Sequence, residues 1–175
     1  MILTGSEIIK GVKLGRIVID PFLKKNINPN SYNYRLGNKL FIISDKVIDP
    51  KKNVKTREVP LKNGGWLLKP GRLYLGHTIE SFGSKDFVVS LIGRSSVGRL
   101  GLFLQITADL GNLGKNHCWT LELKVVQPLW IYPKMKIGQI CFWRPLGGKK
   151  NSYCSKYWQY SLPHSSEIFR EIGNN

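Results

Sequence analysis

The chain has 175 residues, and its 27 lysines and arginines outnumber its 11 aspartates and glutamates, which gives a formal net charge of +16. This length suits one domain with a substantial core, and a hydrophobic content of 42% argues against a disordered chain. The sequence has no run of about 18 apolar residues, which a membrane-spanning helix needs. It also begins without the basic and then apolar segments of a secretory signal. We therefore expect a cytoplasmic protein with no membrane partner.

The positive charge is spread along the chain. Lysines occur in small groups, such as Lys24-Lys25 and Lys51-Lys52, and no arginine-rich arm or basic helical stripe is present. This pattern favours a solvated basic surface, or one that attracts small polyphosphates, over a nucleic-acid interface. The three cysteines are widely spaced, without a Cys-x-x-Cys pair, which is typical of reduced thiols rather than a disulfide framework.

One helix is predicted near the N-terminus. Thr4 and Glu7 have the spacing of a capping box, in which a hydroxyl and a carboxylate three residues later satisfy free amides of the first turn. Ile8 and Val12 then lie on one apolar stripe, and Gly15 can end the helix.

After this helix the sequence pattern is that of β-strands. Apolar, β-branched and aromatic residues recur in short runs that are separated by glycine and proline. Strands are predicted at residues 16–20, 39–43, 66–68, 73–75, 87–92, 102–106, 119–126, 129–132 and 137–143. Many short strands at regular spacing indicate an all-β sandwich or barrel. The pattern is lost near the end, so we expect one β domain over 1–150 and a C-terminal tail over 151–175.

A first candidate motif follows the strand predicted at 87–92. The strand stops at a glycine, after which come Arg94, Ser95, Ser96 and Arg99. Free backbone amides, two small hydroxyls and two guanidinium groups suit a polyanion such as a triphosphate. The alternative is an ordinary surface turn with exposed arginines and serines.

A second candidate is Glu122, a carboxylate between two leucines of a predicted strand. The period of two places Glu122 on one face with Thr120 and Lys124, opposite the leucines. If that face lines a cleft, loss of solvent raises the pKa of Glu122 and suits it to proton transfer. If the face is open to solvent, Glu122 is an ordinary exposed residue.

The zinc ligands of a metal-dependent deaminase are missing. Such enzymes need His-x-Glu followed by Pro-Cys-x-x-Cys, so that zinc can activate a water molecule. The histidines here are His77, His117 and His164, and none has that spacing. Any deamination by this chain is therefore expected to use water that is not bound to zinc.

The motifs, taken in order, resemble the dCTP deaminase branch of the trimeric dUTPase superfamily. The most specific part is Gly-Arg-Ser-Ser with an arginine four residues after the first serine, followed by Thr107-Ala108 and then Leu121-Glu122. The resemblance extends over nearly the whole chain and includes the segments 1–5, 19–22, 28–37, 69–71, 75–80 and 137–139.

This resemblance implies a distorted β-barrel of the β-clip type that assembles as a homotrimer with sites between subunits. It implies a nucleotide substrate, with Mg²⁺ bound through the triphosphate as the one metal. Glu122 matches the glutamate that moves protons while water attacks C4 of cytosine. Ser95 and Arg99 match residues around that water and base, and Arg94, Ser95 and Ser96 match a phosphate-binding turn.

The remaining residues that match substrate contacts of the family are Thr107, Ala108, Asn112, Thr120, Gln139, Lys156 and Tyr157. In the family, Ala108 matches a backbone position that helps to hold the attacking water, and Gln139 matches a phosphate ligand. Lys156 and Tyr157 match a C-terminal pair that closes on the nucleotide.

The sequence also departs from the family pattern. Asn112 replaces an aspartate that positions the hydrolytic water in dUTPases and meets the sugar in deaminases. Gln105 replaces a histidine, and Gly98 replaces an alanine. The segments 113–117 and 158–160 also differ from the usual residues. These changes indicate a divergent member with a modified pocket.

We therefore expect deamination of a deoxycytidine nucleotide, dCTP plus water giving dUTP plus ammonia, with Glu122, Ser95 and Arg99 as catalytic residues and no protein-bound metal. One alternative is a dUTP pyrophosphatase or a bifunctional deaminase and pyrophosphatase, which Asn112 disfavours because an amide is no general base. Another is a catalytically silent homologue that binds nucleotide or nucleic acid.

Overall fold

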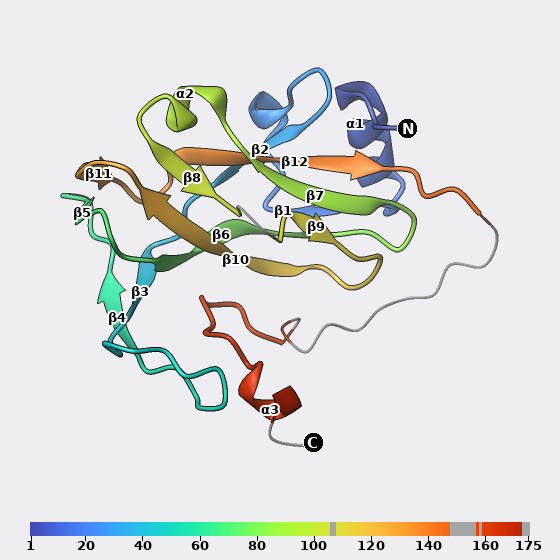
Figure 1. Cartoon of the computed structure of the whole chain (residues 1–175). Helices are drawn as coiled ribbons and strands as arrows, with labels where there is room; N and C mark the ends of the chain where they lie inside the picture. Colours follow the sequence, from blue (N-terminus) through green and yellow to red (C-terminus); the bar gives the residue numbers. More distant parts are fainter. Residues whose placement is uncertain (106–107, 148–156, 158, 173–175) are drawn as a thin grey trace.

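The computed structural model describes residues 1–105, 108–147, 157 and 159–172 (Figure 1). The helical elements are α1 (Gly5–Lys13), the short turns α2 (Ser95–Gly98) and α3 (Phe169–Ile172), and the 3-10 turn η1 (Lys24–Asn26). The strands are β1 (Val18–Asp20), β2 (Tyr32–Arg35), β3 (Lys39–Ile43), β4 (Thr56–Pro60), β5 (Trp66–Leu68), β6 (Tyr74–Gly83), β7 (Val88–Gly93), β8 (Leu102–Leu104), β9 (Leu110–Gly111), β10 (His117–Val125), β11 (Leu129–Ile131) and β12 (Lys136–Trp143). The predicted all-β class with one N-terminal helix is confirmed.

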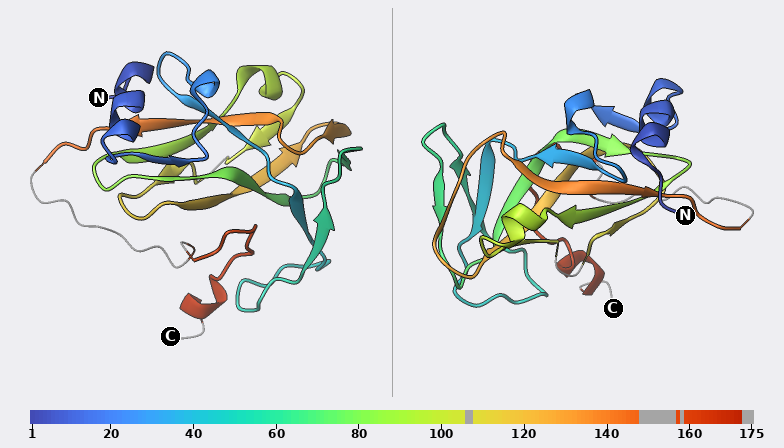
Figure 2. Two further views of the ribbon diagram at one scale, coloured as in Figure 1. Left: turned by 180° about the vertical axis from the view of Figure 1, so that it is seen from behind. Right: turned by 90° about the horizontal axis from the view of Figure 1, so that it is seen from above.

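The strands form two larger sheets and one small one. Within each sheet, all pairs of neighbouring strands are antiparallel. The first sheet has the order β4-β3-β6-β10-β8, with β1 also paired to β6. The second has the order β2-β12-β7-β9, and β11 pairs with β5 separately. Figures 1 and 2 show the two larger sheets as layers, with the C-terminal segment beyond the first sheet.

The core fills the space between these layers. Both sheets contribute side chains that are completely buried, among them Tyr34 from β2, Phe82 from β6, Leu121 and Leu123 from β10, and Phe142 from β12. At about 25 cal/mol per Å² of apolar surface, each such side chain stabilises the fold by about 1.5–3 kcal/mol before its ordering entropy is subtracted. The core therefore fixes β10 through its inner face, and the outer face of this strand does not pack in the core.

The predicted N-terminal cap is present. The Thr4 hydroxyl accepts a long hydrogen bond of 3.5 Å from the Glu7 amide at the start of α1, and Ile8 is completely buried. Gly15 follows the helix with a φ of +66°, a left-handed conformation that glycine adopts without strain.

Several elements differ from the sequence prediction. β2 was not predicted because Asn33 and Arg35 interrupt its apolar pattern, although Asn33 is buried. β4 is a polar edge strand that ends at Pro60, where the missing amide is tolerated. Residues 95–98 form a helical turn rather than an irregular one. No helix in the described part of the chain is long and apolar enough to cross a membrane.

Candidate active site

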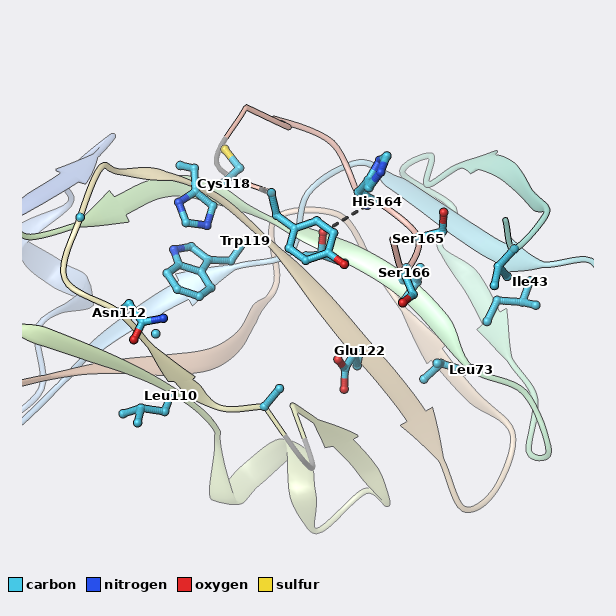
Figure 3. A pocket seen from close by; sticks show the side chains of 18 of the residues that line it. Ile43, Leu73, Leu110, Asn112, Cys118, Trp119, Glu122, His164, Ser165 and Ser166 are labelled. Carbon is cyan, nitrogen blue, oxygen red and sulfur yellow. Dashed lines mark hydrogen bonds between the residues drawn. The ribbon is translucent and has the colours of Figure 1, made fainter. Parts of the chain in front are cut away.

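An open cavity of about 580 Å³ lies along the outer face of β10 (Figure 3). Its floor consists of β10 side chains, one end is the segment from Ala108 to Lys115, and the tail covers part of it. A set of aliphatic side chains forms another part of the lining, called here the aliphatic wall: Ile43, Ile48, Val54, Leu73 and Leu75. The cavity is thus mostly apolar with a few polar groups, as is usual for small-molecule sites.

Glu122 lies on the floor of this cavity. The burial pattern along β10 alternates, with Leu121 and Leu123 buried in the core and Glu122 on the outer face. Burial raises the pKa of the Glu122 carboxyl above its ordinary value. Among the described residues no side chain makes a hydrogen bond or ion pair with that carboxylate. Of the two orientations that the sequence left open, the structure shows the one that faces a cavity, and the group is suited to accept and return a proton.

The backbone of Glu122 is held by a neighbouring side chain. The Glu122 amide donates a hydrogen bond of 2.7 Å to Oε1 of Gln105, which is buried just after the end of β8. Gln105 also has a φ of +46°, which is uncommon for a residue other than glycine.

Asn112 lies at the aromatic end of the cavity. The ring of His117 stacks on Trp119 with 4.4 Å between centroids, and the Trp119 Nε1 donates to the Phe82 carbonyl at 3.1 Å. Gly111 allows this arrangement, because a Cβ there would lie 2.3 Å from the Trp119 ring. Burial lowers the pKa of His117, which keeps its ring neutral at neutral pH.

The tail lies against the cavity through a hydrogen-bonded cluster. The His164 amide donates to the Thr120 hydroxyl at 3.1 Å, and the His164 ring stacks on Tyr160 at 3.6 Å. The Tyr160 hydroxyl donates to Glu167 at 2.8 Å, and the Glu167 amide donates to the Tyr157 hydroxyl at 3.0 Å. These bonds bring Tyr157, a predicted substrate contact, to the cavity wall.

The residues of the Gly-Arg-Ser-Ser motif lie elsewhere in this chain. Ser95, Ser96 and Arg99 are exposed on and next to α2, and none of them lines the cavity. Arg94 donates from its guanidinium to the Lys136 carbonyl at 2.9 Å, which anchors the turn to β12. Figure 1 shows α2 and the C-terminal segment on opposite sides of the molecule.

Gln139 also lies away from the cavity, on β12. Its amide donates a 3.4 Å hydrogen bond to Asn33 of β2. Within one chain, the predicted contacts Ala108, Asn112, Thr120 and Tyr157 therefore join Glu122, whereas the motif residues and Gln139 do not. Thr107 and Lys156 lie outside the described residues.

Sequence reasoning did not predict the rest of the cavity. His117 and Trp119 precede Glu122 on the same strand, but a strict period of two would place them on the face of Leu121, opposite Glu122. β10 has a register shift between Cys118 and Thr120, and both aromatic rings line the cavity. The aliphatic wall includes Ile48 and Val54 from the long β3–β4 connection, which carried no pattern. His164 came from a tail without periodicity.

The comparison with protein-family models decides the family. A model described as dCTP deaminase-like matches residues 2–145. The chain belongs to this dCTP deaminase-like family. The resemblance seen in its motifs is thereby confirmed.

Curated relatives match over almost the full chain. A protein of Hathewaya histolytica named "dCTP deaminase, dUMP-forming" is 45% identical over 173 residues, which cover 98% of this chain and 99% of the relative. A protein of Clostridium beijerinckii with the same name is 43% identical over 159 residues, 91% of each chain.

A solved structure supports the fold. The crystal structure of 2′-deoxycytidine 5′-triphosphate deaminase from Agrobacterium tumefaciens superposes with a TM-score of 0.63 at 23% identity and covers 81% of this chain. The match covers 47% of that solved chain, so this chain spans about half its length. The predicted dUTPase-like architecture is consistent with this neighbour.

Proposed function

We propose that the protein deaminates dCTP, with Glu122 as the group that moves the protons. The observation that carries this proposal is a half-buried carboxylate with a raised pKa on the floor of a nucleotide-sized cavity, in a chain of the dCTP deaminase-like family. The names of the curated relatives supply the substrate.

The chemistry needs one carboxylate that acts twice. As water adds to C4 of the cytosine, the Glu122 carboxylate takes one proton from it and passes that proton to N3 of the ring. Glu122 then takes the second proton from the new C4 hydroxyl and gives it to the exocyclic amine, so that the C4–N4 bond breaks, C4=O forms, and ammonia leaves a uracil ring. Burial moves the pKa of Glu122 towards neutral pH, which favours both the uptake and the release of a proton.

We propose that no protein-bound zinc takes part. Among the described residues, no group of three His, Cys, Asp or Glu side chains is placed to hold a metal ion. Glu122 is the one carboxylate among the described cavity residues, so Mg²⁺ would take its ligands from the triphosphate and water. Its role there would be to neutralise phosphate charge.

We further propose that the active form is a homotrimer in which two copies complete each site. Glu122 lines the cavity, but Ser95 and Arg99 lie on another surface of the same chain. A neighbouring copy can bring them together. Co-expression of Glu122→Gln and Arg99→Ala chains should then restore activity that neither variant has alone. Light scattering should give three chains per particle, whereas a fully active monomer would contradict the proposal.

Asn112 decides which product we expect. Its side-chain amide lies in the cavity and has no proton-accepting pKa near neutrality. A water aimed at the α-phosphorus would lack a general base there, so we propose that dUTP is the product. The second candidate is onward hydrolysis to dUMP, which the "dUMP-forming" names of the relatives favour.

One experiment tests both points. Purified protein is incubated with dCTP, CTP, dCMP and dUTP in separate reactions, and the products are separated by chromatography. We expect ammonia and dUTP from dCTP, unchanged dUTP, and new dUTP hydrolysis in Asn112→Asp. Unchanged dCTP would overturn the deaminase proposal, and dUMP from the wild type would support the second candidate.

A further inference from the structure

Gln105 connects two parts of the candidate site. Its Oε1 accepts the Glu122 amide at 2.7 Å, and its Nε2 lies 3.5 Å from the Ala108 carbonyl, at the long limit of a hydrogen bond. The Gln105 side chain is therefore placed between the strand that carries Glu122 and the segment that forms one end of the cavity.

The strand geometry explains why this side chain is needed. β8 pairs with β10 as far as Leu104, which lies opposite Leu123. The next pair would be Gln105 with Glu122, but the φ of +46° at Gln105 turns the backbone away from the ladder. The side-chain amide then takes over as the acceptor for the Glu122 amide. Without this acceptor the Glu122 amide would have no hydrogen-bond partner, which destabilises the fold at this strand.

We propose that Gln105 is a positioning residue for the deamination, because it fixes the Glu122 carboxylate relative to the Ala108 backbone. This inference rests on the proposed function. Gln105 is buried, so it acts through Glu122 and Ala108 and not by contact with the nucleotide.

Glutamine also suits this position electrostatically. Its amide offers an acceptor and a donor in one neutral group, so it can serve an N–H and a carbonyl without adding charge near Glu122. A carboxylate of the same shape would keep the acceptor, lose the donor and place a second negative charge beside the first. That charge would favour the protonated form of Glu122 and raise its pKa further.

Two variants and one control test the proposal. Gln105→Leu removes both hydrogen bonds, and we expect kcat to fall about 10–100-fold with KM within about twofold, because the reacting groups are misplaced while binding remains. Gln105→Glu keeps the shape, and we expect the acid limb of its kcat/KM profile to move up by about one pH unit. Gln127→Leu, at an exposed glutamine in the turn after β10, should behave like the wild type.

The outcomes separate this inference from the proposed function. If the wild type does not deaminate dCTP, the proposed function fails first. If the wild type is active and Gln105→Leu keeps its kcat, the positioning role is wrong. If Gln105→Leu does not fold, Gln105→Glu decides: an unmoved acid limb overturns the inference, and an upward shift supports it.

Discussion

Glu80 in β6 and Glu122 in β10 lie on neighbouring strands of one sheet, but their carboxylates have different surroundings. Glu80 is completely buried and accepts the Arg35 guanidinium at 2.6 Å and the Arg35 amide at 2.8 Å. Glu122 faces the cavity, and the described residues supply its carboxylate with no cation. A paired carboxylate holds two sheets together, whereas an unpaired one at a cavity is available for chemistry.

The largest effect is expected from Glu122→Gln. The amide is nearly isosteric but cannot accept and return a proton, so kcat for dCTP should fall about 10²–10⁴-fold while nucleotide still binds. Calorimetric titration and single-turnover assays measure the two quantities separately. Glu58→Gln, which changes the exposed β4 carboxylate paired with Lys39, is the matched control. A near-normal kcat in Glu122→Gln would remove Glu122 from the mechanism.

Glu80→Gln should lose stability and keep its kcat, which is the reverse of the result expected for Glu122→Gln. Removal of one partner leaves the Arg35 guanidinium in a largely buried position without its counter-charge, which typically destabilises a fold by about 3–5 kcal/mol. Urea unfolding measures this loss. The molecules that remain folded should keep their kcat, because Glu80 does not line the cavity. The double variant Arg35→Met, Glu80→Gln should regain stability, and a fully stable Glu80→Gln would contradict the structural role.

The pH dependence of stability sharpens the comparison. Burial raises the pKa of Glu122 in the folded state above its unfolded value of about 4.3, so the folded state prefers the protonated form. Its ionisation therefore opposes folding as pH rises through the folded pKa. Glu122→Gln should be more stable than the wild type at pH 7, and the difference should shrink near pH 4. Equal urea midpoints for the two proteins at pH 7 would contradict this account.

A third carboxylate, Glu167, should contribute to stability with the opposite pH dependence to Glu122, and its effect should be smaller. The hydrogen bond from the Tyr160 hydroxyl, with help from His164 and Arg170, lowers the pKa of Glu167. The stabilisation by ionised Glu167 is fully present above the pKa of glutamate in the unfolded chain, about 4.3. It is lost as pH falls through the lower pKa of the folded state. Glu167→Gln should therefore increase proteolysis of the tail at pH 7, and this difference from the wild type should shrink as pH falls below about 4. Unchanged cleavage at both pH values would show that this cluster does not hold the tail.

The sequence predicted the features that local patterns control. The Thr4 cap, the strands at 39–43 and 66–68, and the alternation that turns Glu122 away from the core follow from spacing and periodicity. The residue types of the Gly-Arg-Ser-Ser motif made it a candidate phosphate site. Resemblance supplied candidates such as Ala108 and Gln139, because neither periodicity nor composition assigns them a role.

The features that were missed depend on contacts between distant residues. The Gln105 hydrogen bond to Glu122 joins residues 17 positions apart, and the Glu80–Arg35 pair joins residues 45 apart. The aliphatic wall from the β3–β4 connection arises only when that loop folds beside β10. The sequence also placed Arg99 and Glu122 in one site, which a single chain does not form.

Ammonia release from dCTP by zinc-free protein tests the central claim most directly. The protein is dialysed against a chelator, resupplied with Mg²⁺ alone and mixed with dCTP, and ammonia and uracil nucleotide are measured together. The account predicts equal amounts of both products at the rate of untreated protein. No turnover until zinc is added would contradict the role given to Glu122 and to water that is not bound to zinc.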